Sequence, residues 1–175
     1  MNSFKRVVAI TLCFCFVILS SSSFQVDASV DKGYVRSVKS YLRRHSFKAK
    51  YYKYDYLNNT GNGYVYAEDE YKLKTIDIYF ANSKKKTNRI YISELQDWAA
   101  TINEKKRQSL NIKKLSRNTF RIISKYDGWW GVAVVKKDTY EHRVFYYIRW
   151  YYSKKHMKRK IRNQLKLINK LNNLY

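Results

Sequence analysis

The chain of 175 residues contains no proline, only five glycines and two cysteines, Cys13 and Cys15, both close to the N-terminus. So little proline and glycine argues against a flexible, linker-rich protein. A chain that begins after residue 28 would have no cysteine, which excludes structural disulfides and thiol catalysis. Tyrosine is abundant instead, with 18 copies. Because aromatic residues are the material of a core, the composition is not that of a disordered basic tail.

Acidic side chains are also scarce, with 13 aspartates and glutamates against 36 lysines and arginines and a formal charge of +23. Removal of residues 1–28 would take away Lys5, Arg6 and Asp27, leaving 34 basic and 12 acidic side chains and a charge of +22. A field of one sign on a small domain attracts anionic partners and weakens the compact state through self-repulsion.

The first residues have the pattern of a secretory signal. Lys5 and Arg6 precede an apolar run over 7–19, and a polar segment then ends at Ala28. Cleavage after Ala28 is predicted. The run is too short for a standard transmembrane span, and neither cysteine follows the small residue that lipoprotein processing needs. We expect a secreted or cell-wall associated protein; the alternative is a membrane tether formed by an uncleaved signal anchor. By association alone, a cysteine-free exported chain is typical of a Gram-positive bacterium.

Residues 29–175 have the length of a single domain. Asp31 is a good N-cap for a first helix that reaches about Arg44. Its apolar residues Val35, Val38, Tyr41 and Leu42 share one face. Tyrosine-rich extended segments are then predicted over 49–56, 64–68 and 72–81, with a turn-forming loop over 58–63.

The middle of the chain is predicted to turn, return and enter a second helix. The polar run 83–88 would form the turn, and 89–92 would return as a short strand. Ser93 and Gln96 have the spacing of a capping box, so the helix is expected to begin there and to end near 105–108. Its inward residues would be Leu95, Trp98, Ala99 and Ile102.

Asp127-Gly128 is the strongest local signal in the chain, because this dipeptide favours the type I′ turn of a tight β-hairpin. A two-residue loop would place Tyr126 opposite Trp129 and Lys125 opposite Trp130. The other predicted pairs are Ser124 with Gly131, Ile123 with Val132, Ile122 with Ala133, Arg121 with Val134, and Phe120 with Val135.

The two tryptophans of this hairpin are expected to differ in exposure. Trp129 shares the more apolar face and is predicted to be largely buried. Trp130 is predicted to be more exposed, beside Lys125 and Arg121. A cation–π contact there would contribute about 0.5–1 kcal/mol.

The C-terminal stretch is predicted to be a strand over 143–152 followed by a cationic helix over about 154–174. One face of the strand is apolar, and the other mixes aromatic residues with arginine. Two interpretations of the helix remain open: its apolar stripe packs on the sheet of its own domain, or it lies on an anionic membrane. The stripe consists of Met157, Ile161, Leu165, Ile168, Leu171 and Leu174.

These elements predict an α+β fold, with a mainly antiparallel sheet of about six or seven strands and about three helices. We expect the helices to cover one face of the sheet. A weak internal echo raises the hypothesis of two α-β-β-β halves, near 31–92 and 93–152, with the C-terminal helix as an addition.

Catalytic patterns are missing from the sequence. His45, His142 and His156 lack partners at zinc-site spacing, and no nucleophile elbow, phosphate loop or dinucleotide motif occurs. The acidic run Glu68-Asp69-Glu70 could hold a cation weakly but is more often an intramolecular partner for lysines. We therefore expect a protein that is not an enzyme and needs no metal or cofactor.

Aromatic residues interleaved with lysine and arginine suit a polymer that has both phosphates and flat faces. The expected function is non-enzymatic binding to an anionic polymer: a teichoic-acid-like wall polymer, an anionic lipid surface or extracellular nucleic acid. The alternatives are a membrane-active, bacteriocin-like or toxin protein, and a secreted inhibitor or immunity factor that docks on an acidic protein. The predicted polyanion-binding residues are Arg121, Lys125, Trp130, Arg143, Arg149, Lys154, Lys155, Lys158, Arg159, Arg162 and Lys166.

Overall fold

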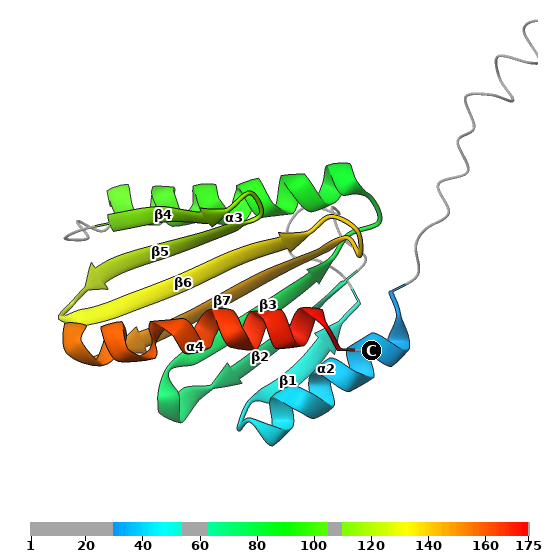
Figure 1. The fold of residues 1–175 in the computed structure, drawn as a ribbon, viewed down its shortest axis with the longest axis horizontal. Helices are drawn as coiled ribbons and strands as arrows, with labels where there is room; N and C mark the ends of the chain where they lie inside the picture. Colours follow the sequence, from blue (N-terminus) through cyan, green and yellow to red (C-terminus); the bar gives the residue numbers. More distant parts are fainter. Residues whose placement is uncertain (1–29, 54–62, 105–109, 175) are drawn as a thin grey trace, which may run out of the picture.

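The computed structural model describes residues 30–53, 63–104 and 110–174 (Figure 1). The predicted segments 54–56, 58–62 and 105–108 lie outside this range. In chain order the elements are α2 (Lys32–Arg44), β1 (Lys48–Tyr52), β2 (Gly63–Asp69), the 3-10 helix η1 (Glu70–Lys72), β3 (Lys74–Phe80), α3 (Lys84–Glu104), β4 (Leu110–Ser116), β5 (Thr119–Tyr126), β6 (Trp129–Asp138), β7 (Arg143–Tyr151) and α4 (Lys154–Asn172).

The strands form one antiparallel sheet of seven strands in the order β1-β2-β3-β7-β6-β5-β4. Strand β7 lies between β3 and β6, and therefore joins the strands before α3 to those after it. The α+β class, the antiparallel sheet and the C-terminal helix are confirmed. In the described part the order is α-β-β-β, then α-β-β-β-β, then α.

Helix α2 begins where its capping residue predicts. One carboxylate oxygen of Asp31 accepts hydrogen bonds from the backbone N–H groups of Gly33 and Tyr34, at 2.7 and 3.1 Å. Val38 and Leu42 are buried on the inner face, as expected. The Tyr34 hydroxyl donates to the carbonyl of Leu171 at 2.9 Å, which fixes α2 beside α4.

Helix α3 begins nine residues before the predicted start at Ser93, because Ser83 is the effective cap. The Ser83 hydroxyl accepts from the N–H of Lys86 at 3.2 Å. The predictions of a turn over 83–88 and of a strand over 89–92 are therefore wrong. Thr87, Ile90, Tyr91 and Glu94 are buried at helical spacing and form its inner face. Leu95 is half-buried there; Trp98, Ala99 and Ile102 have no described side chains.

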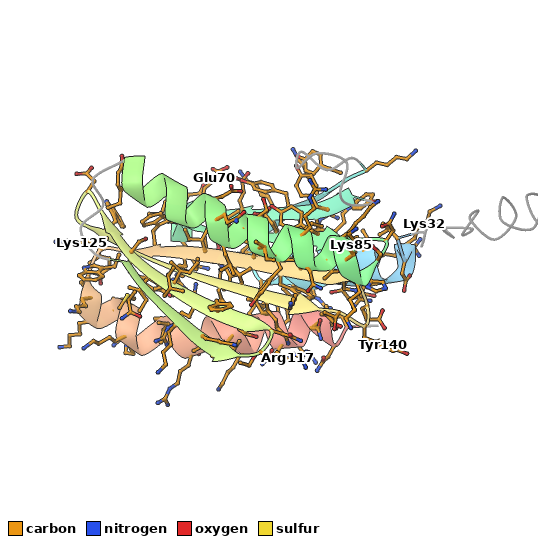
Figure 2. The ribbon with its side chains drawn as sticks, turned by 90° about the horizontal axis from the view of Figure 1, so that it is seen from above. Lys32, Glu70, Lys85, Arg117, Lys125 and Tyr140 are labelled. Atoms are coloured by element: carbon orange, nitrogen blue, oxygen red, sulfur yellow. The ribbon has the colours of Figure 1, made fainter. Side chains whose placement is uncertain are left out.

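Helices cover both faces of the sheet, which corrects the prediction of one covered face. Helix α3 packs on β6 and β7 from one side, while α4 packs on the same strands from the other, and α2 covers β1 and β2 (Figures 1 and 2). Strand β7 shows why both faces of the sheet are covered, because its side chains enter a core on each side. Val144 and Ile148 enter the core beneath α3, whereas Phe145 and Tyr147 enter the core beneath α2 and α4. A strand buried on both faces is nearly continuously hydrophobic.

The Asp127-Gly128 hairpin has the predicted register at every predicted pair. Positive φ angles of 47° at Asp127 and 78° at Gly128 match a type I′ turn. The tryptophan prediction is wrong: Trp129 is 40% exposed, whereas Trp130 is half-buried. Trp129 lies beside the turn, opposite the equally exposed Tyr126, while the first turn of α4 covers the opposite face, where Trp130 lies.

Candidate anion-binding groove

The apolar stripe of α4 packs on the sheet of its own domain, which is the first of the two predicted interpretations. Met157, Ile168 and Leu171 are buried in the core. Gln164 is buried with them, and its side-chain amide donates a 2.8 Å hydrogen bond to the carbonyl of Val132 on β6. Ser153 caps the start of the helix by accepting from the N–H of His156. The opposite side of α4 therefore faces solvent.

The solvent side of α4 consists almost entirely of cations, and nitrogen-tipped side chains extend from it away from the sheet (Figure 2). The helix contains no aspartate or glutamate. Within the described residues, none of its lysines or arginines forms an ion pair. Unpaired, exposed charges are free to meet an external anion. The exposed cations are Lys154, Lys155, Lys158, Arg159, Arg162, Lys166 and Lys170.

A groove lies between the beginning of α4 and the outer strands of the sheet. Helix α4 packs on β6 and β7, so β5 and the edge strand β4 extend past it. The hollow has a volume of about 460 Å³, which lies within the range of small-molecule sites. It is lined by Asn111, Arg121, Ile123, Trp130, Lys154, Met157, Lys158 and Ile161.

Trp130 is the centre of the cationic side of this groove. The Lys154 ammonium lies 5.2 Å from a Trp130 ring centroid, and the Lys125 ammonium lies 5.9 Å from it on the strand side. The contact with Lys125 is the one predicted from the hairpin. Arg121 lines the same groove; its Nε is shielded from solvent and has no hydrogen-bond partner within the described part of the chain. Cations from a strand and a helix therefore converge on one hollow.

Arg143 does not belong to this surface, which corrects its prediction as a binding residue. It is only 6% exposed, and its guanidinium lies 2.8 Å from a Glu141 carboxylate oxygen and 3.5 Å from the Tyr34 ring centroid. It also donates to the carbonyl of Asn172 at 3.5 Å. Arg143 thus links β7, α2 and the end of α4, and has a structural role.

Arg149 is likewise held within the fold. It is half-buried on β7, between Lys74 on β3 and Val132 on β6. Its guanidinium lies 5.1 Å from the Tyr151 ring, and its Nε is shielded from solvent without a hydrogen-bond partner within the described residues. Of the predicted residues, the structure brings together Arg121, Lys125, Trp130, Lys154 and Lys158. The outer side of α4 carries Lys155, Arg159, Arg162 and Lys166.

The sequence prediction missed the uncharged lining of the groove. Asn111 was missed because β4 had no recognised strand pattern. Met157 and Ile161 were assigned to the apolar stripe of α4, and Ile123 to the same hairpin face as Trp130. Only the packing of α4 shows that all three border a hollow. The alternation of Asn111, Lys113 and Leu115 with Leu110, Ile112 and Lys114 is too weak a signal to have located this edge strand.

The acidic island acts as an intramolecular partner for lysines. The Asp69 carboxylate lies 3.2 Å from the Lys74 ammonium, and Glu70 lies 3.0 Å from that of Lys48. Burial pushes the pKa of Asp69 up, but Lys74 and Lys72 outweigh it and leave that pKa below its usual value. Where the structure is described, no cluster of three or more histidine, cysteine or acidic side chains is arranged to hold a metal ion.

Comparison with protein-family models, with curated proteins and with solved structures found no match for this chain. Fold and groove together define a small α+β protein with a seven-stranded sheet and a cationic surface beside its last helix. Among the described helices, none has the length and apolar character needed to cross a membrane.

Proposed function

We propose that this protein is a secreted, non-enzymatic binding protein that associates with an anionic polymer of the cell envelope. The observation that supports the proposal best is the solvent side of α4, where exposed lysines and arginines have no acidic neighbour on the helix. The signal-like N-terminus and the excess of basic residues agree with it. The proposed polymer is a wall polymer of the teichoic-acid type.

Binding of this kind should depend strongly on salt. Exposed cations interact with a polyanion through a screened field, whose range falls from about 10 Å at 0.1 M salt to about 3 Å at 1 M. The polymer also releases its own counterions as lysines and arginines replace them. Both effects weaken the complex as salt rises.

The membrane-active alternative is less well supported, because the apolar stripe of α4 is already used. Met157, Ile168 and Leu171 are buried against the sheet, and Gln164 is hydrogen-bonded to β6. Insertion into a bilayer would require α4 to leave that core. Leakage of dye from anionic vesicles, abolished by deletion of residues 153–175, would favour this alternative.

The test is binding of residues 29–175, which contain every described element, to isolated cell walls. Walls stripped of their anionic polymers serve as the matched control, and both are titrated across a salt series. The proposal predicts binding that is lost on stripping and falls steeply with salt. Equal binding to intact and stripped walls would contradict it and would direct the search to a specific protein partner, as an inhibitor or immunity factor requires.

A further inference from the structure

The groove is larger and more apolar than a simple phosphate contact requires. Its volume of about 460 Å³ is that of a site for a small organic group. Its apolar lining consists of Ile123 from β5 and of Met157 and Ile161 from α4, and the Lys154 ammonium lies 5.2 Å from a ring centroid of Trp130. Inorganic phosphate alone would contact only the cationic side chains of the groove and not these apolar ones.

The start of α4 carries charges that oppose its own helix. Lys154 and Lys155 lie in the first turn, where no acidic residue is present. Positive charge is unfavourable at a helix N-terminus, because the helix dipole is positive there. Lys154 and Lys158 are four residues apart and both line the groove, and like charges at this spacing repel. An anion between them would relieve both conflicts.

The polar groups that reach the groove match a phosphate better than a carboxylate. Arg121, Lys154 and Lys158 bring cations from β5 and α4, and Asn111 adds an amide from β4. A phosphate group that is esterified once has three terminal oxygens, against two in a carboxylate, and carries a charge of about −1.5 to −2 at neutral pH. Arginine and lysine form their strongest hydrogen bonds with ionised oxygens of this kind.

We propose that the groove binds a phosphate group together with the apolar or ring-shaped substituent that it carries. The phosphate lies between Arg121, Lys154 and Lys158, and the substituent lies against Trp130, Ile123 and Met157. This inference rests on the proposed function and narrows it: the recognised unit of the polymer carries a singly esterified phosphate group, and the outer side of α4 adds affinity for the rest of the chain.

The experiment titrates 15N-labelled residues 29–175 with phenyl phosphate, and separately with inorganic phosphate and with benzoate for comparison. Binding is measured from the NMR shifts of the backbone amides and of the tryptophan indoles. Phenyl phosphate is expected to shift the NMR signals of the Trp130 indole and of the first turn of α4. It should bind about tenfold more tightly than inorganic phosphate or benzoate, because only phenyl phosphate contacts both the cationic and the apolar side chains of the groove. Equal affinity for phenyl phosphate and inorganic phosphate would overturn the inference.

Variants test the two parts of the site separately. Arg121→Gln and Lys158→Gln are each expected to weaken phenyl phosphate by about tenfold, the usual loss for a hydrogen bond to a charged group. Trp130→Leu should weaken phenyl phosphate but leave inorganic phosphate unchanged. The matched control is Lys85→Gln, which removes an exposed lysine of α3, the helix on the other face of the sheet from α4. An equal loss in this control would contradict a localised site.

The outcome is distinguishable from that of the wall-binding test. Wall binding that is retained while phenyl phosphate shifts no groove residue would overturn the phosphate site and leave the polyanion function intact. Groove shifts by phenyl phosphate with no binding to intact walls would confirm a phosphate site and overturn the envelope function.

Discussion

Two regions of the molecule use their lysines in opposite ways. At the β2–β3 connection, cations are paired: Lys74 and Lys72 meet Asp69, and Lys48 meets Glu70. Along α4, cations lie in exposed rows without an acid on the helix. A high net charge alone does not show which of its charges face a partner. The comparison separates charges that hold the fold together from charges that remain available.

Asp69→Asn should have the largest effect on stability. It leaves Lys74, whose side chain is only 9% exposed, without its counter-charge, and breaking a buried pair costs about 3 kcal/mol or more. Because the pKa of Asp69 is lowered in the folded state, the wild-type contribution is present above the unfolded pKa of about 4 and is lost as pH falls through the folded value. Urea unfolding at pH 7 measures the loss.

The adjacent control for this prediction is Glu70→Gln. In its pair with Lys48, the two side chains are 62% and 68% exposed, so the loss is expected to be much smaller than that of Asp69→Asn. Equal losses in the two variants would show that the buried pair has no special role.

Arg143→Met is the next largest change, at about 2 kcal/mol, because it removes a buried charge paired with Glu141 and stacked on Tyr34. Wall binding, measured on folded protein, should not change. Arg162→Met, at an exposed position of α4, should show the reverse: weaker wall binding and little loss in urea unfolding. A fall in wall binding for Arg143→Met equal to that for Arg162→Met would contradict the separation of the two regions.

Asp77 has a carboxyl group that lies near a second carboxyl group, that of Glu94. Burial, followed by the nearby Glu94, raises the pKa of Asp77 to about 7. The folded state therefore holds a proton that the unfolded state releases, and stability should fall as pH rises from about 4 to about 7. Asp77→Asn should remove about 1 kcal/mol of this fall between pH 5 and pH 8, since a half-buried carboxyl is partly screened. If the unfolding free energy of Asp77→Asn depends on pH in the same way as that of the wild-type protein, the raised pKa of Asp77 is contradicted.

The smallest predicted effect concerns the first turn of α4. Lys155→Glu should raise the unfolding free energy by about 0.5 kcal/mol, because it replaces a charge that opposes the helix dipole, and it should weaken wall binding. Lys170→Glu, in the last turn, makes the same charge change and should lower stability by a similar amount. Thermal unfolding of both variants checks the sign; a stability change of the same sign in both would show that the dipole is not the cause.

Local patterns were sufficient for several elements of the fold. Asp31 capped α2, Asp127-Gly128 set the hairpin register, and the apolar stripe of α4 marked its packing face. In each case, the residues that form the pattern lie within or next to the element that they predict. The start of α3 was misjudged because Ser83 and Ser93 are both plausible caps, and the lysines after Ser83 resemble a turn. The spacing of Thr87, Ile90, Tyr91 and Glu94 was the signal that distinguishes them.

The site was only partly predictable, because its limits depend on contacts between distant segments. Arg143 and Arg162 are equally basic in the sequence, yet Tyr34 and Glu141 enclose the first and solvent surrounds the second. The groove exists because the edge strand β4 extends past α4, and strand pairing of this kind leaves no local pattern. The basic and aromatic residues on the hairpin and at the start of α4 were predicted, but the hollow between them was not.

The most direct test of the central claim compares two variants of equal charge across a salt series of wall binding. One replaces Lys155, Arg159, Arg162 and Lys166 on α4 with glutamine; the other replaces the exposed Lys32, Arg36, Lys85 and Arg89 on α2 and α3. We predict that the α4 variant loses at least about tenfold in affinity and much of its salt dependence, while the other stays close to wild type. Equal losses in the two variants would contradict a localised binding face and leave net charge as the only cause.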